Sequence, residues 1–194
     1  MTVPAILLAA GESRRLGQPK QLVAVGRELL LERALRVARE AQAHPLLVVL
    51  GAHFASIRAR INFQDAVPIL NEDWQRGIST SIRAGLRELD ARAPQYACAL
   101  FITCDQPCLT AAHLRALIAA HQAHAAPAIA ASSYQGAYGT PAIFPRELFP
   151  QLHALEGDKG ARALINSALC PVVVCPFAGG EIDIDEPSDL EHLR

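Results

Sequence analysis

Hydrophobic and polar positions along the chain fall into short apolar runs separated by longer stretches with helical spacing. The runs are nearly continuous in apolar residues and do not alternate with polar ones, which is typical of strands buried on both faces of a sheet. We therefore predict strands at Val3–Ala9, Leu46–Leu50, Ala66–Leu70, Cys98–Thr103, Ala128–Ala131 and Val172–Cys175.

The stretches between these runs carry Leu, Ile and Ala at the three- and four-residue spacing of amphipathic helices. Thr110 and Ser79 stand where a side-chain oxygen could cap the start of a helix. The expected helices are Leu29–Ala41, Phe54–Ile61, Ile78–Leu89, Ala111–Ala123, Arg146–Leu152 and Lys159–Ser167.

The segment Tyr134–Phe144 interrupts this alternation of strands and helices. Gly136, Gly139 and Pro141 prevent a long helix there, while the apolar end of the segment suggests a short strand. We expect a hairpin or a lid. The rest of the alternation predicts an α/β fold with a mostly parallel central sheet and helices on both faces, in a single domain spanning residues 1–194.

Composition narrows the class of protein. Eighteen basic and nineteen acidic residues give a net charge of -1, which argues against a nucleic-acid or anionic membrane partner. The five cysteines lack CxxC spacing, which disfavours a zinc site and a complete set of disulfides. The N-terminal apolar run lacks a basic start and ends at Gly11, too early for a signal peptide or a membrane span, so we expect a cytoplasmic protein.

The first predicted strand leads into a loop, residues 10–20, that is rich in small residues and carries three cations. Backbone N–H groups of such a loop can bind phosphate oxygens, and Gly11 and Gly17 permit a close approach. Arg15 and Lys20 add positive charge at the carboxyl edge of the sheet, where α/β proteins bind ligands. The loop is thus a candidate anion site, and the alternative is a solvated loop with hydrated arginines.

Two common nucleotide motifs are absent from this loop. A P-loop reads GxxxxGK[ST], whereas Gly11 and Gly17 are six positions apart and Lys20 lies further on. The GxGxxG motif of dinucleotide-binding folds does not occur either, which disfavours a dinucleotide-dependent oxidoreductase. The loop must therefore belong to another type of site.

The loop and several later segments together resemble the motifs of nucleotidyltransferases related to molybdopterin cytidylyltransferase. The loop is similar to LAAGxSxRMGxxK, with Leu16 in place of the methionine. The resemblance spans the chain in order, which makes it more specific than any single motif, and it implies a Rossmann-like nucleotidyltransferase fold. The further matches are Asn71–Ser81 (NxxWxxGMxxS), Thr103–Pro107 (the DQP turn), Gly139–Phe144 (GxPxLF), Gly157–Arg162 (GDxGAR) and Asp183–Leu190 (DIDTPEDL).

The resemblance implies a nucleotide site formed by the loop and by the segment Asn71–Ser81. Gly77 would permit close approach of the base, and the Ser81 hydroxyl would contact its polar edge. The LAAG form of the loop, in place of the LAGG of related guanylyltransferases, implies a pyrimidine nucleotide, most simply CTP. The implied nucleotide-binding residues are Leu8, Ala9, Ala10, Gly11, Ser13, Arg15, Gly17, Lys20, Gly77 and Ser81.

A metal site is expected at the same edge of the sheet. Asp105 follows a buried strand and should lie beside the phosphate loop, where its carboxylate would bind Mg²⁺. A second carboxylate is expected, and the resemblance favours Asp185, although Asp183 on the same strand face is an alternative. These two aspartates could instead cap a helix before Pro187.

The reaction implied by the resemblance is attack by an acceptor oxygen on the α-phosphorus of a nucleoside triphosphate, with release of pyrophosphate. Arg15, Lys20 and Asp105 would be the catalytic residues, acting by position and charge. An ionised phosphate acceptor needs no general base, which agrees with the lack of a recognisable nucleophile–base pair. The resemblance also suggests acceptor contacts at Gly139, Pro141, Asp158 and Arg162.

The acceptor implied most directly is a molybdopterin-type cofactor, delivered to a molybdenum hydroxylase client of the xanthine dehydrogenase kind. Two alternatives stay open. One is a sugar- or polyol-phosphate cytidylyltransferase, and the other is a non-catalytic carrier or chaperone of the cofactor. Trp74 is expected to brace a loop, Cys104 to be a packed neighbour of the site, and His121 and His124 to be solvated helix residues.

Overall fold

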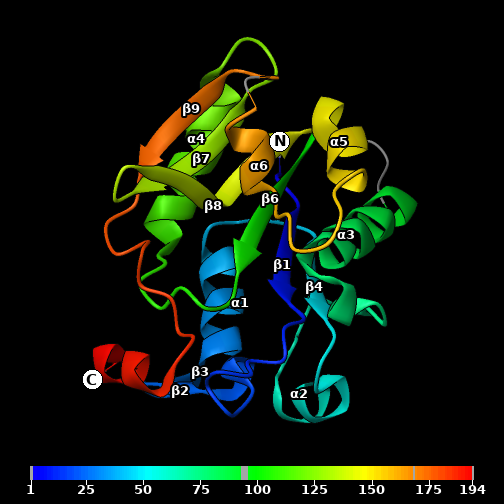
Figure 1. Cartoon of the computed structure of the whole chain (residues 1–194). Coiled ribbons are helices and arrows are strands. Elements are labelled where there is room, and N and C mark those ends of the chain that lie inside the picture. Colours follow the sequence, from blue (N-terminus) through cyan, green and yellow to red (C-terminus); the bar gives the residue numbers. More distant parts are fainter. Residues whose placement is uncertain (1, 93–95, 168, 194) are drawn as a thin grey trace.

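The computed structural model describes residues 2–92, 96–167 and 169–193, and in these residues the centre of the fold is a seven-stranded sheet (Figure 1). The strand order is β5-β4-β1-β6-β8-β7-β9, and β8 alone in this sheet runs antiparallel to its neighbours. The mostly parallel α/β architecture is therefore confirmed. The strands are β1 (Ala5–Ala9), β4 (Leu46–Leu50), β5 (Val67–Leu70), β6 (Cys98–Thr103), β7 (Ile129–Tyr134), β8 (Ala137–Pro145) and β9 (Val172–Pro176).

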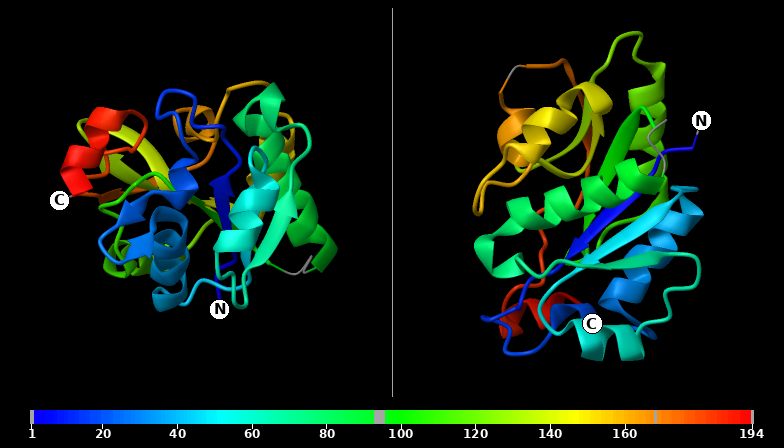
Figure 2. Two further views of the ribbon diagram at one scale, coloured as in Figure 1. Left: turned by 90° about the horizontal axis from the view of Figure 1, so that it is seen from below. Right: turned by 90° about the vertical axis from the view of Figure 1, so that its right-hand side faces the viewer.

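Helices cover both faces of the sheet (Figure 2). Neighbouring residues of each strand point to opposite sides, so both faces present apolar side chains that the helices bury. Leu7 of β1 packs in the same cluster as Leu35, whereas the adjacent Ile6 packs in the cluster of Ile82. One face carries α1 (Leu30–Glu40), α2 (Phe54–Arg60) and α4 (Ala111–Ala123), and the other carries α3 (Ile78–Arg92), α5 (Phe149–His153) and α6 (Arg162–Ile165).

No helix in the described parts of the chain has the length and apolar character needed to cross a membrane.

The segment Tyr134–Phe144 forms the β7–β8 hairpin, with Gln135 and Gly136 at positive φ in its turn. It is not a lid, since β8 lies inside the sheet between β6 and β7. The pairing shifts register between Ala131 and Ser132, so that Thr140 and Pro141 have no opposite residue. This bulge accommodates a proline inside the sheet, because proline has no N–H to donate to the ladder.

Helix starts were predicted with mixed success. Thr110 caps α4 by accepting a hydrogen bond from the backbone N–H of His113, as expected. The Ser79 cap is wrong, since α3 begins at Ile78 and Ser79 is buried inside its first turn. The prediction for Lys159–Ser167 was too long: only Arg162–Ile165 is α-helical. Similarly, the expected helix at Arg146–Leu152 begins as a 3₁₀ turn, η3 (Arg146–Leu148), before α5.

Several short elements were not predicted, because none is long enough to show a periodic pattern. They connect the larger elements around the carboxyl edge of the sheet. These elements are η1 (Lys20–Leu22), β2 (Ala24–Val25), β3 (Glu28–Leu29), η2 (Trp74–Arg76) and η4 (Pro187–Leu193).

The strand order places a crevice at the end of β1. The chain first adds β4 and β5 on one side of β1, and then places β6 on the other side. At such a reversal the loops that follow the two strands diverge, which opens the usual ligand-binding crevice of α/β sheets. In this chain the two diverging loops are the loop after Ala9 and the turn after Thr103.

Candidate functional site

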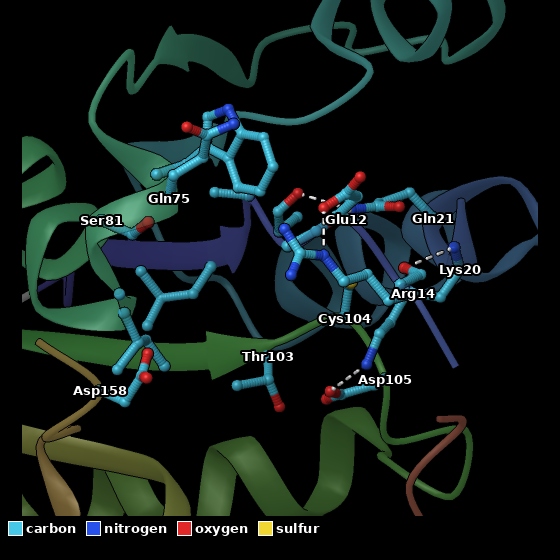
Figure 3. Close-up of a pocket in the computed structure, with 18 residues that line it drawn as sticks. Glu12, Arg14, Lys20, Gln21, Gln75, Ser81, Thr103, Cys104, Asp105 and Asp158 are labelled. Carbon is cyan, nitrogen blue, oxygen red and sulfur yellow. Dashed lines mark hydrogen bonds and ion pairs between the residues drawn. The ribbon is translucent and has the colours of Figure 1, made fainter. Parts of the chain in front are cut away.

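A cavity of about 400 Å³ occupies this crevice (Figure 3). Its walls are the loop after β1, the end of β6 and the start of α3. Figure 3 shows Lys20 and Asp105 on one side of the cavity and Ser81 and Asp158 on the other. The lining includes these residues singled out from the sequence: Leu8, Ala9, Ala10, Gly11, Ser13, Lys20, Gly77, Ser81, Asp105 and Asp158.

The loop after β1 is closed by Ser13, which has a positive φ of 59°. Its carbonyl accepts hydrogen bonds from the N–H groups of Leu16 and Gly17, and its hydroxyl accepts one from the N–H of Lys20 at 3.1 Å. Within the described residues, the N–H groups of Gly11, Glu12 and Ser13 itself donate to no protein acceptor. The loop therefore offers consecutive free amides at the edge of the cavity, as an anion site requires.

Lys20 lies between two carboxylates that are far apart in the sequence. Its Nζ donates to Asp105 Oδ2 at 3.0 Å and also forms a close ion pair with Asp185 Oδ1. Burial alone would lower the pKa of Lys20, but the attraction of Asp105 and Asp185 outweighs it and raises the pKa above its ordinary value. The ammonium is therefore a permanent positive charge that holds both aspartates in place.

The same two carboxylates have the chemistry of a magnesium site. Asp105 and Asp185 each direct an oxygen to one cation position, which Lys20 Nζ fills here, and Mg²⁺ favours one or two carboxylates completed by water and phosphate oxygens. No group of three or more potential metal-ligating side chains is found in the described residues. A pair of carboxylates fits magnesium with a phosphate substrate better than it fits a closed metal cage.

Asp183 is less suited to this role than Asp185. Partial burial, together with the neighbouring charges of Asp105 and Asp185, raises the pKa of Asp183 to about 7. The repulsion from those two charges applies while no cation is bound, and a bound metal ion would lower the pKa again, so the choice between the two aspartates rests on position. Asp185, which already contacts Lys20 beside Asp105, is the better-placed partner.

Arg15 lies outside the cavity and is largely exposed. Its guanidinium donates to Asp185 Oδ2 at 3.0 Å and to Glu186 Oε1 at 3.1 Å. Gly17, at a positive φ of 73°, also lies outside the lining. Next to them, Leu16, Val23, Leu30 and Ile184 form a small apolar cluster that joins the loop to the C-terminal segment. Arg15 thus faces Asp185 and Glu186 and is not part of the cavity lining.

The far side of the cavity is shaped by buried polar contacts. Asn71 is 4% exposed, and its Nδ2 donates to Thr80 Oγ1 at 2.8 Å and to Ser81 Oγ at 3.0 Å. Gly77 has φ 100°, and a Cβ there would lie 2.3 Å from the carbonyl carbon of Gly157. Glycine at position 77 therefore permits the contact that brings Asp158 to the cavity wall.

Trp74 has two roles in the structure. A Cβ at Gly51 would lie 2.5 Å from Trp74 Cβ, so the tryptophan packs directly on that backbone and braces the loop, as expected. It also lines the cavity. The tryptophan thus adds an apolar surface to the cavity lining.

The residues suggested for the acceptor are not gathered at the cavity. Only Asp158 lines it. Gly139 lies in β8 under the Tyr134 hydroxyl, where a Cβ would be 2.2 Å from that oxygen, and Pro141 lies in the bulge of the same strand. Arg162 is exposed at the start of α6.

Cys104 is a packed neighbour of the site, as predicted. Burial and the adjacent Asp105 carboxylate raise the pKa of its thiol to about 12, so it is protonated and unreactive at neutral pH. His121 lies on α4 and His124 at its end, and each donates from its Nδ1 to a nearby backbone carbonyl, that of Ala128 and that of Ala126 respectively.

Two buried amides of the site were not predicted from the sequence. Gln21 bonds to the carbonyls of Ala9 and Gly11, and Asn71 positions Ser81. Neither amide has a periodic or charge signal. The available clue was their position, since Gln21 directly follows Lys20 and Asn71 begins a matched segment.

The chain matches a family model described as the MobA-like NTP transferase domain over residues 5–172. Purine catabolism protein PucB of Bacillus subtilis is 30% identical over 200 residues, which cover 97% of this chain and 94% of that protein. Nicotine blue oxidoreductase of Paenarthrobacter nicotinovorans is 29% identical over 199 residues, covering 98% and 96%.

Among solved structures, Rv0371c from Mycobacterium tuberculosis H37Rv superposes with a TM-score of 0.86 at 29% identity, covering 100% of this chain and 97% of that one. A second structure of Rv0371c, described as a complex with manganese, has a TM-score of 0.82 at 28% identity and covers 100% and 98%. The similarity extends over the whole chain and includes all parts of the cavity.

Proposed function

This chain belongs to the family of MobA-like NTP transferase domains, and on that premise we propose that it is a magnesium-dependent nucleotidyltransferase. It transfers CMP from CTP to a phosphate-bearing acceptor and releases pyrophosphate. The observation that carries this proposal is the meeting of Lys20, Asp105 and Asp185 beside the free amides of the loop. This arrangement combines an anion site with a cation site at one edge of the sheet, which is what a magnesium–triphosphate complex needs.

The chemistry asks little of the protein beyond position and charge. An acceptor oxygen forms a bond to the α-phosphorus, the bond to the β-phosphate oxygen breaks, and the electron pair leaves with pyrophosphate. Magnesium held by Asp105 and Asp185 would neutralise the charge on the phosphates. Lys20 exchanges carboxylate for phosphate oxygens, and the amides of Gly11 and Glu12 bind the phosphate chain.

The base and sugar are assigned to the opposite wall. Gly77 lines this wall, Ser81 presents a hydroxyl fixed by Asn71, and Trp74 supplies an apolar surface. The preference for CTP rests on the sequence of the loop, Leu8-Ala9-Ala10-Gly11. GTP and ATP are the alternative nucleotides, and the assay of pyrophosphate release described below distinguishes them from CTP.

The acceptor proposed here is a molybdopterin-type cofactor, with a molybdenum hydroxylase as the client that receives it. Two facts support this: the sequence motifs resemble those of molybdopterin cytidylyltransferase, and a similar protein is named for purine catabolism. Asp158 at the cavity wall is the best-placed acceptor contact, while Gly139, Pro141 and Arg162 would need to be reached from outside the cavity.

The test is to incubate the protein with magnesium, molybdenum cofactor and CTP, GTP or ATP in turn, and to measure pyrophosphate release. Cofactor-dependent release with CTP supports the proposal. Release with sugar or polyol phosphates instead would assign the alternative transferase. Tight binding without release would assign a carrier, and oxidation or reduction of nicotine blue would point to the activity for which one relative is named.

Neutralising Glu186 is expected to strengthen nucleotide binding slightly. Glu186→Gln removes one of the two carboxylates that hold Arg15 away from the cavity. Since exposed ion pairs contribute little, we expect CTP to bind about twofold to threefold more tightly, measured by titration calorimetry with magnesium. Glu191→Gln removes the same charge from the same segment without touching Arg15, and an equal gain in that variant would contradict the explanation.

A further inference from the structure

Gln21 is a buried amide that holds the loop from behind. It is 1% exposed, and its Nε2 donates to the carbonyl oxygen of Ala9 at 2.7 Å and to that of Gly11 at 3.1 Å. Between them, the carbonyl of Ala10 accepts a hydrogen bond from the N–H of Ala52 at 3.0 Å. Three consecutive carbonyls of the loop are thus fixed by protein donors.

The orientation of these carbonyls determines where the neighbouring N–H groups point. In a planar trans peptide unit, the C=O of one residue and the N–H of the next point in opposite directions. Holding the Gly11 carbonyl against Gln21 therefore directs the Glu12 N–H away from Gln21. Holding the Ala10 carbonyl against the N–H of Ala52 likewise directs the Gly11 N–H away from Ala52. These are two of the amides that have no protein acceptor in the described residues.

The chemistry of the side chain is specific. Only an –NH₂ group at position 21 can donate to both carbonyls, so the assignment of Nε2 and Oε1 follows from the partners. Oε1 is buried and has no partner in the described residues. A buried acceptor without a partner destabilises a fold, so what the amide contributes here is its pair of donors.

We propose that Gln21 is a positioning residue for the nucleotide: its two N–H groups hold the loop carbonyls so that the loop amides face the triphosphate. This inference rests on the proposed function of the loop as a triphosphate site. It assigns no contact between Gln21 and the reacting atoms. The expected consequence is that loss of the donors weakens nucleotide binding more than it weakens the fold.

Gln21→Glu keeps the shape of the side chain and replaces both donors with a carboxylate facing two carbonyl oxygens. We expect CTP with magnesium to bind at least about tenfold more weakly at pH 8, because the repelled loop turns its amides away. When the carboxyl is protonated it donates one hydrogen bond, so the ratio of variant to wild-type affinity should recover as the pH falls towards about 5.5. Calorimetry across this range measures the ratio, which cancels the titration of CTP itself.

Gln18→Glu is the matched control, because it places the same charge on the same loop at an exposed position. A deficit of equal size and equal pH dependence in this variant would overturn the proposal. Gln21→Met removes the donors without adding charge. We expect it to weaken CTP binding as well, because the loss of the donors, and not the added charge, is the proposed cause. Thermal unfolding of all three variants identifies any loss of fold.

A measurement without nucleotide separates this proposal from the proposed function. In ¹⁵N NMR spectra of the free protein, Gln21→Met should broaden or shift the amide signals of Gly11 and Glu12, while Gln18→Met should leave them in place. Unchanged signals in Gln21→Met would overturn the positioning role. If the signals change but the wild-type protein binds no nucleoside triphosphate, Gln21 still positions the loop and the proposed function is the part that fails.

Discussion

Asp105→Asn is expected to lower the rate of pyrophosphate release by about a thousandfold while the fold remains intact. The substitution keeps the size of the side chain but removes one of the two carboxylates proposed to hold magnesium. It also leaves Lys20 with Asp185 as its remaining carboxylate partner in the described residues, so the ammonium is held less firmly and the expected loss of rate is assigned to the metal site. Steady-state assays over a range of magnesium concentrations measure the loss.

Metal dependence distinguishes this explanation from a general disturbance. If Asp105 is a metal ligand, higher magnesium should recover part of the lost rate in Asp105→Asn by mass action. Asp65→Asn removes an aspartate that pairs with Arg39 on the surface, and its rate should stay close to that of the wild type. A fully active Asp105→Asn variant would exclude the proposed site.

The position of Asp105 was predictable because it depends on local sequence. A buried apolar strand must end at the edge of the sheet, and the residue that follows it must lie at that edge. The same reasoning placed the phosphate loop after β1. The parallel direction of β1, β4, β5 and β6, though not their order in the sheet, also follows from continuous apolar runs joined by helical segments.

Contacts between distant parts of the chain were not predictable in the same way. Asp185 lies 165 residues from Lys20, and the sequence pattern alone could not choose between it and Asp183. The strand β8 was underestimated because Gly136, Gly139 and Pro141 are read as breakers, whereas Gly136 lies in the hairpin turn and a bulge accommodates Pro141 within the sheet. Gln21 has no signal of its own, since its importance comes from carbonyls whose directions only the folded loop defines.

One consequence of the folded arrangement is that Lys20 would compete with a metal ion bound at the proposed site. Its ammonium occupies the position at which the Asp105 and Asp185 oxygens meet, and their charges keep it protonated. The negative charge of the two carboxylates is therefore offset in part before any ligand binds. A magnesium–triphosphate complex brings both a cation for the carboxylates and anions for the lysine, so the two partners are exchanged together.

Lys20→Met should consequently change two measurements in opposite directions. The rate of pyrophosphate release should fall by about a hundredfold or more, because a cation that stabilises the phosphates is lost. The affinity of the nucleotide-free protein for Mn²⁺, measured by electron paramagnetic resonance, should rise by about tenfold, because no ammonium competes for Asp105 and Asp185. Arg60→Met removes the same charge from an exposed position and should change neither quantity appreciably. Weaker Mn²⁺ binding in Lys20→Met would mean that these carboxylates are held for Lys20 alone and do not form the metal site.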